Sequence, residues 1–392
     1  MRSRTEVALA GLIVLTLTGA CADPATQRVS LMNDPSAPPS SSLAPAMPRV
    51  ATDAPTMPGG TPSPSSFRPP PLVPATSLAE PMATGRPLTA TGPPRFFVTA
   101  RTPIFSFTDS SKTAHATPVP PAVNDAVTGA FVAAVPLPPG VRSSWHLVAA
   151  APDNRTFVLA GWTGLDTPLR LFRIRLDEKG RPGEPELVPD LEPEPDQVTA
   201  MALSQDATRL AYTVTLVGGG TKVAVLDLAT GRRRDWVTRE STAVMGLAWA
   251  PDGRRLAMAM LPSGVKVLDL GNKGSDLIAA SRPVRPDRAD RAVWIPQSVA
   301  FTPDGGALLY SAGHDVERVP VAGGRPQVVA RLTLPRGASL GLRFSIDGTG
   351  RQLLYTDGWR ARRVDLADGS TTSVRIDAGK RSGEGESPVA AW

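Results

Sequence analysis

Cysteine and histidine are scarce in this sequence, and their scarcity limits the sites that the chain can form. Among 392 residues there is one cysteine, Cys21, so no disulfide can form within the chain. The three histidines, His115, His146 and His314, are not spaced as the ligands of a zinc site are. A disulfide scaffold and a histidine-rich metal centre are therefore not expected.

Long hydrophobic runs and sustained helical periodicity are also missing. The N-terminal apolar stretch, 7–17, is shorter than the about 20 residues that a membrane-spanning helix needs. Instead, 35 glycines and 42 prolines interrupt the chain often enough for repeated β-hairpins. The sequence therefore predicts an all-β fold after the N-terminal region.

The first 21 residues are typical of an export signal, with a basic start, a short apolar core and small residues before a cysteine. The ending Gly19-Ala20-Cys21 resembles a bacterial lipobox, although Thr18 replaces the usual leucine. This resemblance implies that Cys21 carries a lipid, such as palmitate, and holds the protein at the outer, extracytoplasmic face of a cell membrane. The alternative is an ordinary signal peptide cleaved near Cys21, which would release a secreted protein.

Residues 22–93 have the composition of a linker. They contain 17 of the 42 prolines, and serine, threonine and alanine fill most of the remaining positions. Large apolar residues are too few to offset the entropy of ordering the chain, so a disordered, extended spacer is expected. The predicted organisation is a signal at 1–21, this linker at 22–93 and a folded domain at 94–392.

The predicted domain is built from imperfect copies of one hairpin. In the clearest copy, 245–258, Leu247 and Trp249 alternate with small residues before a Pro-Asp-Gly turn. The copies align on an aspartate that follows an apolar residue by three positions. These aspartates, which we interpret as structural turn residues, are Asp153, Asp206, Asp252, Asp304 and Asp347, after Ala150, Leu203, Trp249, Phe301 and Phe344. Their spacing of 43 to 53 residues is the period of a propeller blade.

These hairpins, followed by a strand and turn such as Val-Leu-Asp-Leu-Ala-Thr-Gly at 225–231, resemble the WD40-like repeats of TolB-type β-propellers. The resemblance covers approximately 94–392. In the 206 and 347 copies the Pro-Asp-Gly turn is replaced, and the last copy needs two extra residues to align. The resemblance implies a fold but no particular function, because propellers include both binding proteins and enzymes.

The first blade lacks an innermost strand, and the end of the chain can supply it. Residues 95–100 match a second strand, whereas 388–392 match an inner strand with no turn after it. Trp392 would then occupy the position that Trp249 has in its own blade. The sequence therefore predicts a six-bladed β-propeller whose ring is closed by the C-terminal strand and by Trp392.

Catalytic patterns are weak. Gly-Ala-Ser-Leu-Gly at 337–341 matches a nucleophile elbow, but a strand follows Ser339 and no histidine lies downstream. The repeated aspartates invite a calcium interpretation, yet an aspartate at a turn corner is explained by hydrogen bonds to backbone amides. No catalytic residue, metal site or cofactor is predicted.

Two functions from different classes remain. The first is a membrane-tethered, extracytoplasmic propeller that binds an unknown protein or glycan partner and catalyses nothing. The second is a metal-dependent propeller enzyme of the lactonase or sugar-oxidising type. The formal charge of +6 and the arginine clusters could suit a nucleic acid, but an exported protein rarely meets one, so no nucleic-acid partner is expected.

Overall fold

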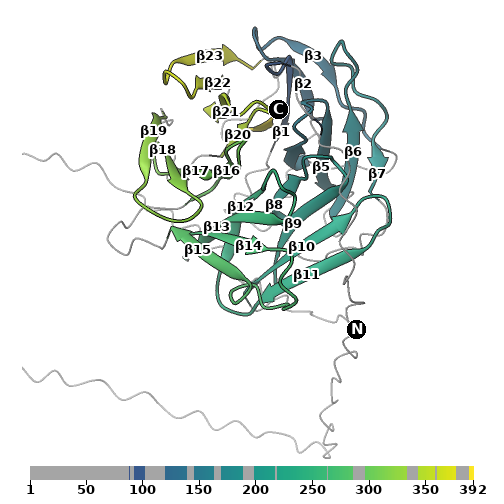
Figure 1. Cartoon of the computed structure of the whole chain (residues 1–392). Coiled ribbons are helices and arrows are strands. Elements are labelled where there is room, and N and C mark those ends of the chain that lie inside the picture. Colours follow the sequence, from purple (N-terminus) through teal and green to yellow (C-terminus); the bar gives the residue numbers. More distant parts are fainter. Residues whose placement is uncertain are drawn as a thin grey trace, which may run out of the picture. The chain divides into compact units, whose positions relative to one another are not determined.

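The computed structural model describes Leu88 and residues 92–101, 120–138, 145–162, 169–188, 198–216, 219–262, 264–285, 296–332, 343–357, 360–376 and 388–392. All regular structure in these residues is β, arranged as six four-stranded sheets (Figure 1). The all-β prediction is confirmed. The predicted signal and nearly all of the predicted linker lie outside the described residues, and their boundaries stay predictions.

Each sheet is one blade of the predicted propeller, and its strands are listed here from the innermost outward. Blade 1 contains β24 (Pro388–Ala391), β1 (Phe96–Arg101), β2 (Ala122–Asp125) and β3 (Phe131–Ala134). Blade 2 contains β4 (Trp145–Ala150), β5 (Thr156–Trp162), β6 (Leu169–Arg175) and β7 (Glu186–Leu187). Blade 3 contains β8 (Val198–Leu203), β9 (Arg209–Thr215), β10 (Thr221–Asp227) and β11 (Arg233–Thr238).

Blades 4 to 6, like blades 2 and 3, each come from one continuous stretch of chain. Blade 4 contains β12 (Ala243–Trp249), β13 (Arg255–Leu261), β14 (Gly264–Asp269) and β15 (Ser281–Arg285). Blade 5 contains β16 (Val299–Phe301), β17 (Ala307–Ala312), β18 (Asp315–Pro320) and β19 (Gln327–Arg331). Blade 6 contains β20 (Phe344–Ile346), β21 (Gln352–Asp357), β22 (Arg360–Asp365) and β23 (Thr371–Arg375).

The inner strands form a closed ring. Each inner strand contacts the next one around the ring, in the order β24, β4, β8, β12, β16 and β20, and β20 contacts β24. The buried hydrophobic residues form six clusters, each shared by two neighbouring blades. Stability is therefore distributed over the blade interfaces, because a single four-stranded sheet cannot cover both of its own apolar faces.

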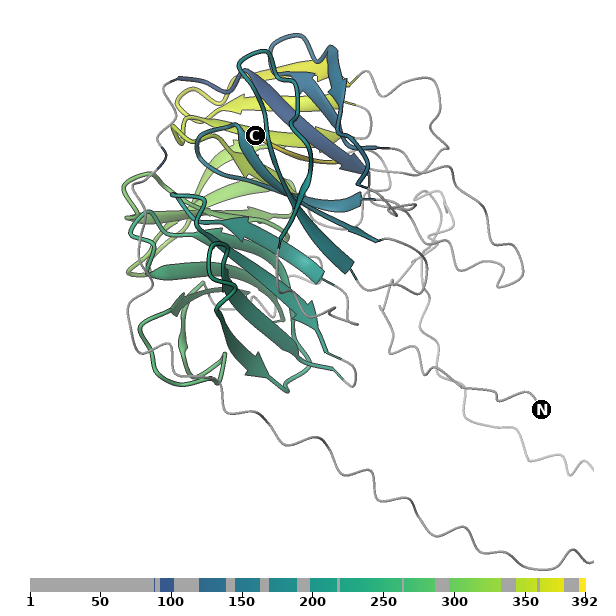
Figure 2. The same ribbon diagram turned by 90° about the vertical axis from the view of Figure 1, so that its right-hand side faces the viewer.

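The predicted closure is confirmed. In blade 1, β24 pairs antiparallel with β1, placing Ala391 opposite Val98 and Ala390 opposite Thr99. The C-terminus accordingly lies beside the first sheet in both views (Figures 1 and 2). Trp392 directly follows β24, and continuing this register by one residue would set it opposite Phe97, as Trp249 is opposite Leu256 in blade 4. Trp392 is 1% exposed and packs between blades 6 and 1.

The predicted hairpins join the first and second strands of blades 2 to 6 through one turn geometry. We number the turn residues from the position that forms the closing hydrogen bond, so that Ala250 is the first turn residue of blade 4. In each hairpin this first residue donates its N–H to the carbonyl five positions later, as Ala250 does to Arg255 at 2.9 Å. The fourth turn residue has a positive φ in every copy. These residues are Asn154, Ala207, Gly253, Gly305 and Gly350. Glycine tolerates this left-handed conformation, whereas alanine at 207 adopts it at an energetic cost.

The turn of blade 6 corrects the alignment of Asp347. Its N–H donates to the Gln352 carbonyl at 2.9 Å, so Asp347 is the first turn residue and corresponds to Ala250. Thr349 occupies the position of the other aspartates, and Ile346, not Phe344, corresponds to Trp249. No extra residues are needed. The alignment on aspartate was wrong here because Asp347 also accepts hydrogen bonds from turn amides, although it lies two positions earlier in the turn. Its side chain accepts from the backbone N–H groups of Arg351 and Gln352, each at 2.9 Å.

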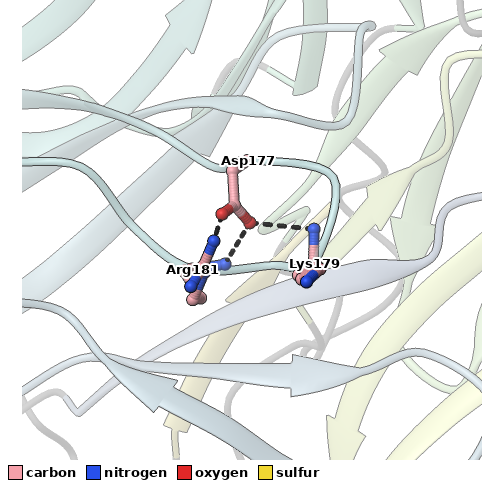
Figure 3. Close-up of polar contacts among 3 residues, drawn as sticks. All are labelled: Asp177, Lys179 and Arg181. Atoms are coloured by element: carbon pink, nitrogen blue, oxygen red, sulfur yellow. Dashed lines mark hydrogen bonds and ion pairs between the residues drawn. The ribbon is translucent and has the colours of Figure 1, made fainter.

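A second aspartate turn joins the third and fourth strands of several blades. Between β6 and β7, Asp177 accepts hydrogen bonds from the backbone N–H groups of Lys179 and Arg181 and from Arg181 Nε, at 2.8 to 2.9 Å (Figure 3). These bonds from Arg181 lower the pKa of Asp177. Both aspartate turns lie at the face of the ring where the inner strands end, which we call the turn face.

Candidate functional site: the central channel

The inner strands enclose a cavity of ≈ 360 Å³. All six blades contribute to its walls, through 147–152, 200–203, 245–249, 297–303, 343–348 and 389–392. Hairpin residues such as Pro152, Pro251 and Pro303 also line it, so the cavity reaches the turn face. Because the ring is closed, the walls come from positions spread over the whole domain.

The wall is mostly apolar. Its half-buried hydrophobic residues include Val148, Met201, Met245, Ala248 and Ala390, and both Trp249 and Trp392 border it. The lining residues with polar side chains are Gln205, Gln297, Ser298, Thr302, Arg343, Ser345 and Asp347. Only two of these, Arg343 and Asp347, are ionisable, and they stand at the two ends of β20.

Arg343 extends across the channel. It precedes β20 of blade 6, and its Nη2 donates to the backbone carbonyl of Thr199 at 3.4 Å. Thr199 belongs to β8 of blade 3, which lies three blades away in either direction around the ring. Arg343 as a whole is half-buried and is one of the residues that line the cavity. Burial lowers the pKa of Arg343.

Hydrogen bonds fix the backbone at both ends of this span. Next to Arg343, the N–H of Phe344 donates to Ser298 Oγ of blade 5 at 2.9 Å. On the opposite side, Thr199 Oγ1 donates to the Val244 carbonyl of blade 4 at 2.8 Å. Arg343 is therefore positioned by neighbouring blades rather than by a carboxylate, and no ion pair involves it within the described residues.

The carboxylates of the predicted turn aspartates accept hydrogen bonds from backbone N–H groups of their own turns. Asp153 accepts from the N–H groups of Arg155 and Thr156 at 2.9 and 2.8 Å. Asp206, Asp252 and Asp304 accept backbone N–H groups of Thr208, Arg254 and Gly306 at 3.1, 2.9 and 3.0 Å. The turn geometry thus accounts for these carboxylates. Within the described residues, no group of three histidine, cysteine, aspartate or glutamate side chains is arranged to hold a metal ion.

Asp347 is the one predicted turn aspartate among the residues that line the cavity. It is 3% exposed, and it accepts hydrogen bonds from Thr349 Oγ1 and from two backbone N–H groups of its own turn. It contributes negative charge at the turn-face end of the channel, opposite the arginine end.

Several residues considered from the sequence do not join this site. Cys21, His115 and Ser339 lie outside the described residues, as does the side chain of His146. His314 is exposed in the turn between β17 and β18. Trp392, predicted only as a closing residue, also borders the cavity. Arg343 was missed, because no sequence signal distinguishes one arginine before a strand from the many others in this chain.

Comparisons with known proteins identify no family for this chain. No family model and no curated protein sequence matches this chain. A similar solved structure is a chain in the crystal structure of a nidogen/laminin complex, with 16% identity, a TM-score of 0.42, and coverage of 56% of this chain and 78% of that one. Another is a protein of Agrobacterium tumefaciens assigned as TolB, with 14% identity, a TM-score of 0.42, and coverage of 67% and 92%. Likenesses this distant carry no argument about function.

The six sheets arranged in a closed ring show by themselves that the domain is a β-propeller. In the part of the chain that the structure describes, no helix has the length and hydropathy that crossing a bilayer requires.

Proposed function

We propose that this protein is a membrane-tethered, extracytoplasmic β-propeller that binds a protein or glycan partner and catalyses no reaction. The observation that carries the proposal is the closed ring around a cavity to which all six blades contribute. A concave, largely apolar wall with a few placed polar groups is the usual form of a ligand site. The carboxylates nearest to it are already engaged by turn amides.

The proposed tether rests on the N-terminal sequence. Cys21 would carry the lipid, and the proline-rich segment 22–93 would separate the ring from the membrane surface. A proline-rich chain extends about 3.1 Å per residue, so this segment could span up to roughly 200 Å. That reach would allow the ring to meet partners well beyond the lipid headgroups.

Site-specific photocrosslinking in cells tests the binding role. A diazirine side chain placed at Met201, which is half-buried in the cavity wall, should capture a partner as a discrete adduct. The matched control is Val328 on the outermost strand of blade 5, which is 47% exposed. Adducts at Val328 alone, or at neither position, would contradict binding through the channel.

The tether and the absence of catalysis are tested separately. Cys21→Ser should move the protein from the membrane fraction to the soluble fraction and abolish incorporation of labelled fatty acid. An unchanged membrane fraction would refute lipidation at Cys21. Stoichiometric calcium or zinc in the purified full chain would favour the metal-dependent enzyme instead.

A further inference from the structure

The central channel contains a cation that is paired with no carboxylate among the described residues. We propose that Arg343 is the head of a carboxylate-binding site, and that the ligand is a carboxylate joined to an apolar body that fills the cavity. This inference deepens the proposed binding function and rests on it. It concerns the ligand chemistry that the channel itself can recognise.

The first argument is the unused hydrogen-bonding capacity of the guanidinium. An arginine has five N–H donors in a planar fork that matches a carboxylate. The contact to the Thr199 carbonyl, at 3.4 Å, uses one of its nitrogens. A buried charge is costly unless it is paired, so a carboxylate arriving in the cavity would relieve the desolvation that Arg343 undergoes without one.

The second argument is the wall beside Arg343. Met201, Met245 and Val148 present half-buried apolar surface to the same cavity. These side chains suit a hydrocarbon or aromatic body, and methionine adapts readily to different shapes. A volume of ≈ 360 Å³ is suited to a small molecule or to the terminal residues of one chain.

The third argument concerns the number of charges on the ligand. Asp347 follows Arg343 by four residues along the strand, which corresponds to about 13 Å of extended chain. It is a lining residue at the turn-face end of the same cavity and carries a carboxylate there. A second negative group on the ligand would meet this carboxylate, so the channel should prefer a monoanion with a single carboxylate.

The test uses the purified full chain and a series of simple probes. Hexanoate and 4-phenylbutyrate are titrated beside their neutral amides, with calorimetry and intrinsic tryptophan fluorescence as readouts, since Trp249 and Trp392 border the cavity. The carboxylates should bind at least about tenfold more tightly than the amides, as expected for a charge-assisted pair. Glutarate, a dicarboxylate similar in length to hexanoate, should bind more weakly than hexanoate.

Variants show whether Arg343 is responsible. Arg343→Gln should remove the preference for carboxylate over amide, and Arg343→Lys should retain part of it. The matched control, Arg325→Gln, alters an exposed arginine in the turn between β18 and β19 and should leave binding unchanged. Near-ultraviolet circular dichroism confirms folding, and if Arg343→Gln is unfolded, Arg343→Lys decides the test.

Three results would overturn the proposal: equal binding of acid and amide, no binding of any acid, or an unchanged acid preference in the Arg343 variants. The source of the carboxylate is distinguished by a further pair, a short apolar peptide with a free C-terminus and the same peptide amidated. Tight binding only by the free peptide indicates a polypeptide ligand, whereas tight binding by the small acids indicates a metabolite. Failure here leaves the Met201 crosslinking result untouched, so failure of this proposal can be distinguished from failure of the proposed binding function.

Discussion

Blade 4 and blade 1 perform the same structural task with differently connected chain. Blade 4 is one continuous stretch, whereas blade 1 combines β24 from the C-terminus with strands that begin at Phe96. Both place a tryptophan at the end of the inner strand, against the preceding blade. Trp249 Nε1 donates to the Ala202 carbonyl at 3.0 Å, and the Arg209 guanidinium lies over its ring, 4.6 Å from the centroid.

The corresponding tryptophan of blade 1 is held differently. Trp392 Nε1 is buried and has no hydrogen-bond partner among the described residues. The interface between blades 6 and 1 is instead supported by apolar packing and by a bond from Arg363 Nη1 to the Ala126 carbonyl at 3.1 Å. The comparison indicates that Trp392 is held by packing between blades 6 and 1, whereas Trp249 is held between blades 3 and 4 by packing, a hydrogen bond and an arginine over its ring.

The largest effect is expected from removing the closing strand. Deletion of 388–392 leaves β1 with an unpaired edge and removes Trp392 from the interface between blades 6 and 1. The variant should unfold at a much lower temperature and denaturant concentration than the full chain. A deletion variant that melts like the full chain in calorimetry would refute the role of β24 in stabilising the ring.

Truncating the two tryptophans compares the interfaces directly. Trp392→Ala and Trp249→Ala each remove a buried aromatic side chain and should cost about 3–5 kcal/mol in free energy of unfolding. Urea denaturation of both variants measures the two costs on one scale. Trp249→Ala should cost more, because it also removes the hydrogen bond donated to the Ala202 carbonyl and the ring under Arg209.

A pair of glycines separates backbone strain from steric crowding at the same interface. Gly129 and Gly369 occupy equivalent turns with φ of 74°. A Cβ on Gly129 would lie 2.4 Å from the Arg375 carbonyl oxygen of blade 6, whereas one on Gly369 would meet nothing within 4 Å. Gly369→Ala should cost about 1 kcal/mol from the left-handed conformation alone. Gly129→Ala should cost roughly 1–3 kcal/mol more by crowding the interface, and equal costs would mean that this interface yields easily.

The smallest expected difference between the two tryptophans comes from the conservative exchange of each one for phenylalanine. Trp249→Phe removes the hydrogen bond donated to the Ala202 carbonyl and should cost about 0.5–1.5 kcal/mol more than the loss of ring area. Trp392→Phe removes an indole N–H that has no partner among the described residues, so only the change in packing should appear. Denaturant midpoints for the two variants, compared with the alanine series, would show whether the polar bond explains the difference.

Much of the fold could be predicted because each hairpin is specified locally. The alternation around Leu247 and Trp249 and the turn at 251–253 predict a hairpin without reference to the rest of the chain. Blade 6 shows the limit of this reasoning. Asp347 looked equivalent to Asp252, but hydrogen-bond register, which a single sequence does not display, assigns that position to Thr349.

The candidate site was harder to predict because its residues lie far apart in the sequence and come together only in the folded ring. Arg343 and Thr199 are 144 positions apart, and they meet only because blades 6 and 3 face each other across the channel. Position along the chain does not indicate which arginine among the 42 basic residues would point inward. The arginine clusters were conspicuous in the sequence, whereas Arg343 was not.

The sequence by itself determined the all-β class, the repeat and the strand that closes the ring, because each depends on alternation and turn chemistry over a few residues. The tertiary structure alone decided the register of blade 6, the cavity wall and the place of Arg343. These depend on the angle at which six sheets meet around an axis, which is set by the packing of every blade against its neighbours.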